Sequence, residues 1–199
     1  MCMGMLMVIM TAWITPGDDR FRLAIVGFTE AVHQEYYRSQ YGRKPVYLDV
    51  LVENLSNILQ SEFDLVEREK IDLINKEREI AKKNNGEENS EIIIGRLIGA
   101  KYVLTGVITE LNKEIRYFKG YGVVRETTNC RMAASFRILN TANGEIITVG
   151  ESGTSKSYRN SPSPDTIIRD LSKDLSIDIA NQVSKCFKEI RDRQRSQEN

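Results

Sequence analysis

The sequence lacks an excess of charge of either sign, because 28 basic side chains balance 28 acidic ones over 199 residues. A protein that binds the phosphates of a nucleic acid needs an excess of basic side chains on one face, so we predict no nucleic-acid partner. The same balance gives no basis for a polybasic membrane-binding surface. Hydrophobic residues make up 41% and charged residues 28% of the chain, which is typical of a folded globular protein rather than a disordered one.

Histidine and cysteine are also scarce. His33 is the only histidine, and the three cysteines are Cys2, Cys130 and Cys186. A zinc site would need His33, Cys130 and Cys186 to converge from separate elements, which we do not expect. No serine, histidine and acid set is apparent, so we predict no catalytic residue, metal or cofactor. In an exported chain Cys130 and Cys186 could form a disulfide; the alternative is three unrelated thiols.

The first fifteen residues, MCMGMLMVIMTAWIT, contain no charged residue. This run is too short to span a bilayer comfortably but fits the apolar part of an export signal. No basic residue precedes it, and a buried N-terminal strand is the alternative interpretation. Cys2 lies before the apolar run rather than after it, so the sequence shows no lipid-anchor signal. We therefore predict a leader over residues 1–15 and no further membrane span.

Hydrophobic periodicity predicts alternating strands and helices in the rest of the chain. The Asn143-Gly144 pair predicts a β-hairpin between apolar runs at 131–139 and 145–149. Together the elements predict an α/β (α+β) domain over residues 21–190. It consists of a single mixed sheet packed by helices, with the hairpin followed by a long C-terminal helix and a polar tail at 191–199. Predicted strands cover 21–28, 62–66 and 102–108, and predicted helices cover 48–59, 67–80, 90–98 and 163–190.

Three sequence motifs resemble those of the CsgG-like family and occur in the family's order. They are LSNILQSEFDLVEREKID (55–72), GAKYVLTGVITE (99–110) and FRILNTANGEI (136–146). The resemblance spans residues 21–190. It implies a periplasmic or outer-membrane associated domain used in envelope assembly of a Gram-negative type. The family's type member oligomerises into a secretion channel for curli subunits, and the penicillin-binding-protein activator LpoB is a relative.

The family motifs single out eight residues as structural candidates. Glu67 and Arg68 are expected to pin a strand to the following helix through an Arg–carboxylate pair. The full set is Glu67, Arg68, Gly99, Ala100, Thr105, Gly106, Asn143 and Gly144.

Channel-forming members of the family insert two long hairpins per subunit into the membrane. The first insertion point here, 111–129, has nearly the needed length but weak alternation, and its outward candidates include a lysine. The second, 150–164, is short, polar and interrupted by two prolines. The resemblance therefore favours a non-enzymatic accessory protein that contacts another envelope protein or a second copy of itself; the alternative is a secretion-channel subunit. The outward candidates at the first point are Ile115, Tyr117, Lys119, Tyr121 and Val123.

The segment GESGTSKS (150–157) nearly spells a phosphate-binding loop, with Lys156 as the phosphate ligand. Such a loop needs glycine immediately before the lysine and a helix after it. Ser155 occupies the glycine position, and the next residues, through Pro164, cannot form that helix. We favour a polar strand end and keep a nucleotide-binding enzyme using Lys156 as a less favoured alternative.

Two tyrosine-rich segments beside basic residues are candidates for a partner surface, because aromatic residues and arginine dominate interface hot spots. The alternative is that these side chains pack on the core. The candidates are Tyr36, Tyr37, Tyr41, Tyr117, Phe118 and Tyr121.

Overall fold

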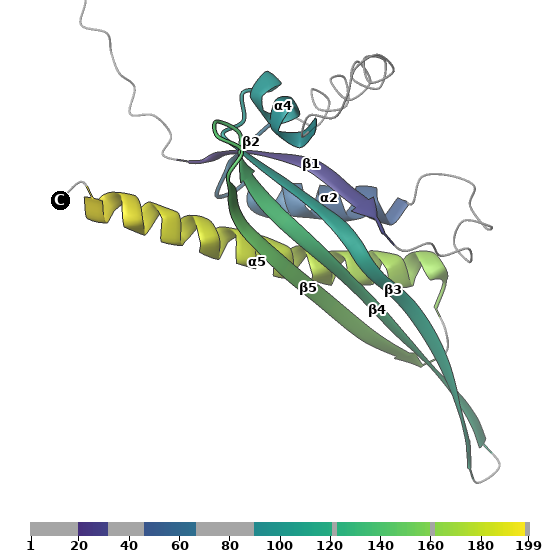
Figure 1. The fold of residues 1–199 in the computed structure, drawn as a ribbon. Coiled ribbons are helices and arrows are strands. Elements are labelled where there is room, and N and C mark those ends of the chain that lie inside the picture. The colour runs from purple at the N-terminus through teal and green to yellow at the C-terminus, as the bar shows by residue number, and fades with distance from the viewer. Residues whose placement is uncertain (1–19, 32–45, 67–89, 121–122, 160–161, 198–199) are drawn as a thin grey trace, which may run out of the picture.

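The computed structural model of the protein describes residues 20–31, 46–66, 90–120, 123–159 and 162–197. Figure 1 shows the described strands side by side in one curled sheet flanked by helices. In chain order the elements are β1 (Arg22–Glu30), α2 (Val46–Leu59), β2 (Asp64–Leu65), α4 (Ser90–Leu97), β3 (Tyr102–Gly120), β4 (Val123–Asn140), β5 (Ile146–Arg159) and α5 (Pro164–Gln197).

The sheet is mixed, with the strand order β2-β1-β3-β4-β5. β1 pairs in parallel with both β2 and β3, whereas β3–β4 and β4–β5 are antiparallel. Parallel neighbours need a crossover connection, and the connections around β1 carry helices, as the sequence pattern predicted. The predicted fold class, one mixed sheet packed by helices with a hairpin before a long C-terminal helix, is confirmed.

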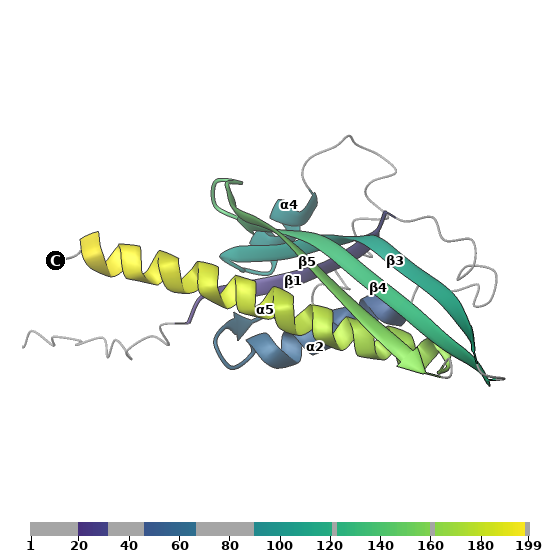
Figure 2. The same cartoon turned by 90° about the horizontal axis from the view of Figure 1, so that it is seen from below.

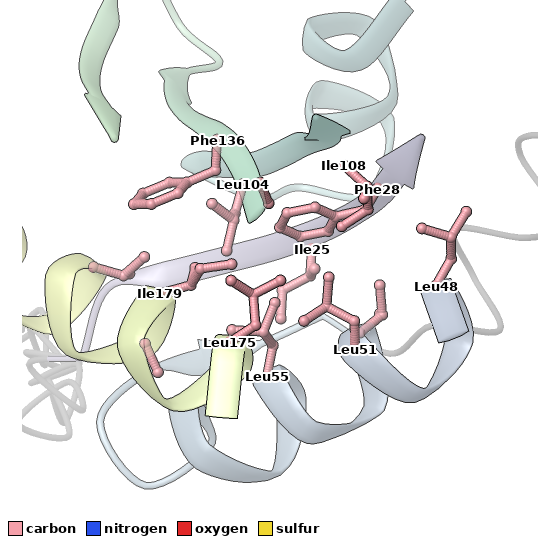
Figure 3. Close-up of a cluster of buried hydrophobic side chains, with 14 of the residues drawn as sticks. Ile25, Phe28, Leu48, Leu51, Leu55, Leu104, Ile108, Phe136, Leu175 and Ile179 are labelled. Atoms are coloured by element: carbon pink, nitrogen blue, oxygen red, sulfur yellow. The ribbon is translucent and has the colours of Figure 1, made fainter. Parts of the chain in front are cut away.

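Helices α2 and α5 lie side by side and cover one face of the sheet (Figure 2). Figure 3 shows Ile25, Leu104 and Phe136 of the strands pointing toward Leu55 of α2 and Leu175 of α5. Burying an aliphatic or aromatic side chain of this size contributes about 1.5–3 kcal/mol, so this layer holds the core together. The predicted stripe of α5 is buried along its whole length: Ile167, Leu171, Leu175, Ile179, Val183 and Phe187.

Helix α4 packs on the opposite face of the sheet over a smaller apolar cluster. The Arg96 side chain ties α4 to the β4–β5 loop, because its Nε and Nη2 donate to the carbonyl groups of Thr141 and Ala142. The cluster consists of Ala24, Ile94, Ile98, Ala100 and Val103. Most of the remaining face of β4 and β5 is exposed to solvent, as is common for an antiparallel sheet.

The predicted Asn-Gly hairpin between β4 and β5 is confirmed. Gly144 has φ +74°, a left-handed conformation that glycine adopts without a Cβ penalty. The loop is longer than a two-residue turn, because the Gly144 N–H donates to the carbonyl of Asn140 and the Asn140 N–H donates to the carbonyl of Glu145, each at 2.9 Å.

Strands β3, β4 and β5 and the last helix are longer than predicted, whereas β2, at Asp64–Leu65, is shorter than the predicted strand at 62–66. The predicted strand at 102–108 continues to Gly120, because pairing with β4 supplies its backbone hydrogen bonds where the side chains turn polar. Helix α5 runs to Gln197 rather than 190, since arginine and glutamine are good helix formers on a solvated surface. The predicted helix at 67–80, Glu67 and Arg68 lie outside the described residues. Within the described ranges, no helix is both long enough and apolar enough to cross a membrane.

Candidate interaction surfaces

The β3–β4 ribbon extends past the rest of the sheet (Figure 1). The last β4 residue paired with β5 is Thr127, so beyond it the ribbon consists of two strands only. Leu111 of β3 and its β4 partner Met132 are buried under the helices, and burial on β4 continues as far as Thr128, beyond which the side chains of the ribbon are partly or fully exposed. The ribbon is therefore the part of the described chain that is least covered by its own helices.

The ribbon carries exposed apolar side chains on both faces. Ile115, Tyr117 and Val124 lie on the face that α2 and α5 cover nearer the body, and they are 42%, 63% and 62% exposed. Phe118, 66% exposed, lies on the opposite face beside its partner Arg125. Exposed large apolar side chains grouped in this way mark interaction sites more often than single ones do.

Register places Val124 with Ile115 and Tyr117 on one face, and Val123, the residue expected there, pairs with Gly120. Lys119 pairs with Val124 and Tyr117 pairs with Glu126, so the parity of the exposed face changes across the turn. Of the six aromatic candidates for a partner surface, Tyr117 and Phe118 are exposed on the ribbon. Tyr36, Tyr37, Tyr41 and Tyr121 lie outside the described residues.

Next to the two-stranded part of the ribbon, polar side chains of β5 contact the first half of α5. We call this row of contacts the polar seam. The Tyr158 hydroxyl donates to Asp170 Oδ2 at 3.2 Å. Burial and the neighbouring Asp170 carboxylate raise the pKa of Tyr158. Cys130 lies on the same side of β4, and burial raises the pKa of its thiol. Thr128, the β4 partner of Tyr158, is fully buried, and its Oγ1 has no hydrogen-bond partner among the described atoms.

The segment 150–157 is part of β5, so the predicted polar strand end is confirmed and no phosphate-binding loop forms there. The Lys156 ammonium lies 2.8 Å from Asp174 Oδ2 on α5, which gives the lysine a carboxylate partner within the protein. The helix that follows starts at Pro164, as predicted, and the Ser163 hydroxyl caps it by accepting from the Thr166 N–H. This helix start is separated from Lys156 by the rest of β5.

The described family-motif residues lie at turns and close packing points. Gly99, with φ +69°, ends α4, and Ala100 is buried beneath that helix. The Thr105 hydroxyl donates to the Gly27 carbonyl on β1 at 3.3 Å. Gly106 lies under the Phe28 ring, where a Cβ would also approach the Ser135 carbonyl oxygen to 2.8 Å.

Asn143, the motif residue before Gly144, organises the β4–β5 loop through its side chain. Its Oδ1 accepts from the Glu145 N–H, and its Nδ2 donates to the Glu145 carboxylate, each at 3.1 Å. These contacts hold the entry into β5 in place.

Cys130 and Cys186 are free thiols, so the disulfide considered from the sequence does not form. Cys130 is buried in the sheet, whereas Cys186 lies partly exposed on α5. His33 lies outside the described residues. Among the residues that the structure does describe, no three histidine, cysteine, aspartate or glutamate side chains are grouped to hold a metal ion.

A groove of about 470 Å³ lies between the start of β5 and the second half of α5. Ile147 and Ile190 face it from the strand and the helix, Phe136 and Tyr102 contribute from β4 and β3, and Cys186 opens onto it. The groove could not be predicted from the sequence, because its two walls, the start of β5 and the second half of α5, are far apart along the chain.

Known proteins resemble this chain in sequence pattern and in fold. The family of the curli production assembly/transport component CsgG matches residues 14–189. Among curated protein sequences, none matches the chain. The hypothetical protein CT253 from Chlamydia trachomatis has a similar structure, with a TM-score of 0.52 and 11% identity over 82% of this chain and 95% of that one.

Two further solved structures are more distant. Lipoprotein GNA1162 from Neisseria meningitidis is 13% identical over 81% of this chain and 99% of its own, with a TM-score of 0.44. The PelC dodecamer from Paraburkholderia phytofirmans is 12% identical over 78% of this chain and 86% of that one, with a TM-score of 0.42. At 11% identity, what the chain shares with CT253 is the fold.

Proposed function

The chain belongs to the family of the curli production assembly/transport component CsgG, and from that membership we propose that it is a non-enzymatic accessory protein of the cell envelope. It acts by contact with another protein, in the periplasm or at the outer membrane of a Gram-negative type envelope. Its contact surface is the two-stranded end of the β3–β4 ribbon.

The exposure of Ile115, Tyr117, Phe118 and Val124 on a ribbon that its own helices do not cover carries this proposal. Aromatic side chains beside basic ones supply much of the binding energy in interfaces, because they bury a large area at a small cost in side-chain entropy. A partner that encloses the ribbon would bury the exposed apolar side chains on both of its faces. Lys156, the candidate phosphate ligand, forms an ion pair with Asp174 of the same chain. This pair supports a protein-binding role rather than nucleotide binding.

The proposal is tested by placing a photo-crosslinking amino acid at Tyr117 in expressing cells. We expect a discrete adduct with one envelope protein in the periplasmic or membrane fraction. The same amino acid at Lys173, exposed on α5 away from the ribbon, provides the control. The combined Tyr117→Ser and Phe118→Ser substitutions, with the crosslinker moved to Lys119, should remove the adduct. An adduct of equal yield from Lys173, or none from the ribbon, would contradict the proposal.

A second candidate is the secretion-channel subunit, and the length of the ribbon favours it. β3 has 19 residues, and the part beyond Leu111 reaches the lower end of the range of about 9–11 residues that a membrane-crossing strand needs. The face of the ribbon that carries Ile115 and Tyr117 also carries Lys119, and β5 lies against α5 rather than forming a second projection. A ring-sized assembly that requires detergent would support the channel, and a monomer in detergent-free buffer would support the accessory protein.

A further inference from the structure

The outer edge of β5 presents backbone groups that no other described strand pairs with, because β5 is the last strand in the sheet order. Gln182 Nε2 on α5 donates to the Glu151 carbonyl at 3.1 Å from this side, so that carbonyl points away from β4. In an antiparallel ladder, every second residue points its N–H and C=O away from the paired strand. Val149 and Gly153 share the parity of Glu151 and therefore present their N–H and C=O groups at the edge.

The groove described above lies beside this edge on the helix side. Its apolar wall comes from Ile147 of β5 and Ile190 of α5, with Phe136 behind them. The groove's volume of about 470 Å³ falls within the about 300–1,000 Å³ typical of ligand pockets. A strand placed along β5 would direct every second side chain toward this space.

We propose that the edge of β5 beside this groove binds an extended, uncharged segment of a partner polypeptide, which adds to the sheet as a further strand. The edge N–H and C=O groups of Val149 and Gly153, on either side of the Glu151 carbonyl that Gln182 already holds, match an extended backbone, and the apolar wall of the groove matches alternate apolar side chains. This surface is separate from the ribbon end on which the proposed function rests.

The charges at the groove support an uncharged segment. Lys185 and Arg193 are balanced by Glu145 and Glu189, so the rim carries no net charge. A site for a polyanion or an anionic lipid surface needs an excess of positive charge.

The position of α5 favours a lone segment over the β5 edge of a second copy. Lys156 and Ser152 of β5 contact α5, so this helix lies directly beneath its own strand. A second copy paired edge to edge would bring its own α5 into the same layer, where the first α5 already forms the groove. An extended segment brings no helix with it.

The test uses the full chain and a capped, uncharged nine-residue peptide, TVTVQVTVT, in which valines alternate with polar residues. Val149→Pro removes an edge N–H and leaves the β4 ladder bonds in place. Val149→Thr restores that N–H with a β-branched side chain, and Lys173→Ala on the exposed side of α5 is the unrelated control. Binding is followed by NMR titration, and the protection of wild-type edge amides is followed by hydrogen exchange.

We expect about 1 mM peptide or less to slow exchange at Val149 and Gly153 of the wild-type chain. We also expect Val149→Pro to weaken binding at least about tenfold, with Val149→Thr and Lys173→Ala within about threefold of wild type. Because the exchange measurement uses the unmodified chain, it decides the matter even where Val149→Pro fails to fold. Unchanged exchange at these amides overturns the proposal. So does concentration-dependent dimerisation that Val149→Pro abolishes, because it would assign the edge to a second copy.

Discussion

The Lys156 ammonium on β5 and the Asp174 carboxylate on α5 lie 2.8 Å apart. Their side chains are 33% and 38% exposed, so the pair is only partly shielded from water. Asp174 is flanked one helical turn away on each side by Asp170 and Asp178, and Lys156 faces the middle position. Lys156, which the sequence pattern indicates as a candidate phosphate ligand, therefore joins β5 to α5.

The flanking aspartates contact β5 in the same way. Asp170 accepts from Tyr158, and Asp178 accepts from Ser152 at 2.6 Å. Because side chains at every second strand position face the same side, while those four apart on a helix share a face, the polar residues meet in order. This seam explains why the second half of β5 is polar although it packs against a helix.

Replacing Lys156 by methionine should lower the free energy of unfolding by about 1 kcal/mol, because the partly shielded Asp174 carboxylate loses its cation. Urea unfolding of Lys156→Met, Asp174→Asn and the double variant measures the coupling between the two side chains. Lys173→Met, on the exposed side of α5, should stay within about 0.5 kcal/mol of wild type. A double variant whose loss equals the sum of the two single losses would show that the pair contributes nothing.

Stability should fall as the pH rises above about 10, because burial and Asp170 raise the pKa of Tyr158 above the ordinary tyrosine value. Above that pH the unfolded chain releases the tyrosine proton, while the folded chain retains it. The folded state then binds more protons, and the free energy of unfolding falls. Burial, with a contribution from Cys186, raises the pKa of Tyr102, which acts in the same direction. Chemical denaturation between about pH 8 and 11 measures the slope.

Tyr158→Phe separates this effect from general alkaline destabilisation. The variant removes the titrating group, so its stability should depend less steeply on pH than that of the wild type. Tyr117→Phe alters an exposed tyrosine on the ribbon and should leave the wild-type slope unchanged. Equal slopes for Tyr158→Phe and wild type would contradict the prediction.

Gly106→Ala should destabilise the chain by about 1–3 kcal/mol, because the added Cβ meets the Phe28 ring and the Ser135 carbonyl within a packed sheet. Gly153→Ala is the matched control on β5. Its Cβ would find Ala133 Cβ at 3.7 Å, which is ordinary contact, and alanine costs less backbone entropy than glycine. Thermal and urea unfolding of both variants test the contrast. A Gly106→Ala variant as stable as Gly153→Ala would show that the sheet can shift to make room.

Elements with a strong local pattern were predictable from the sequence. The stripe from Ile167 to Phe187 repeats every four residues, and only a helix puts such positions on one face. Gly144 follows asparagine between two apolar runs, which specifies the hairpin locally. The mixed sheet then follows from how these elements connect.

Features set by pairing between distant segments were not predictable in the same way. β3 continues beyond Ile108 through partners on β4, so polar side chains do not end it. Val124 joins Tyr117 on one face because of the ribbon's register, which neither segment specifies alone. The groove needs Ile147 and Ile190 brought together by the packing of α5 across β5.

Cys130 and Cys186 should remain reduced and react slowly in the native chain. Burial raises the pKa of both thiols, and Glu189 contributes further to that of Cys186, so less of the reactive thiolate is present at neutral pH. In a Cys2→Ser background, thiol titration after denaturation without reductant should count two free thiols. Native alkylation should label Cys186 before Cys130, since only Cys186 is partly exposed. Fewer than two thiols after denaturation without reductant, restored by a reductant, would reveal a disulfide and contradict the packing of these two side chains.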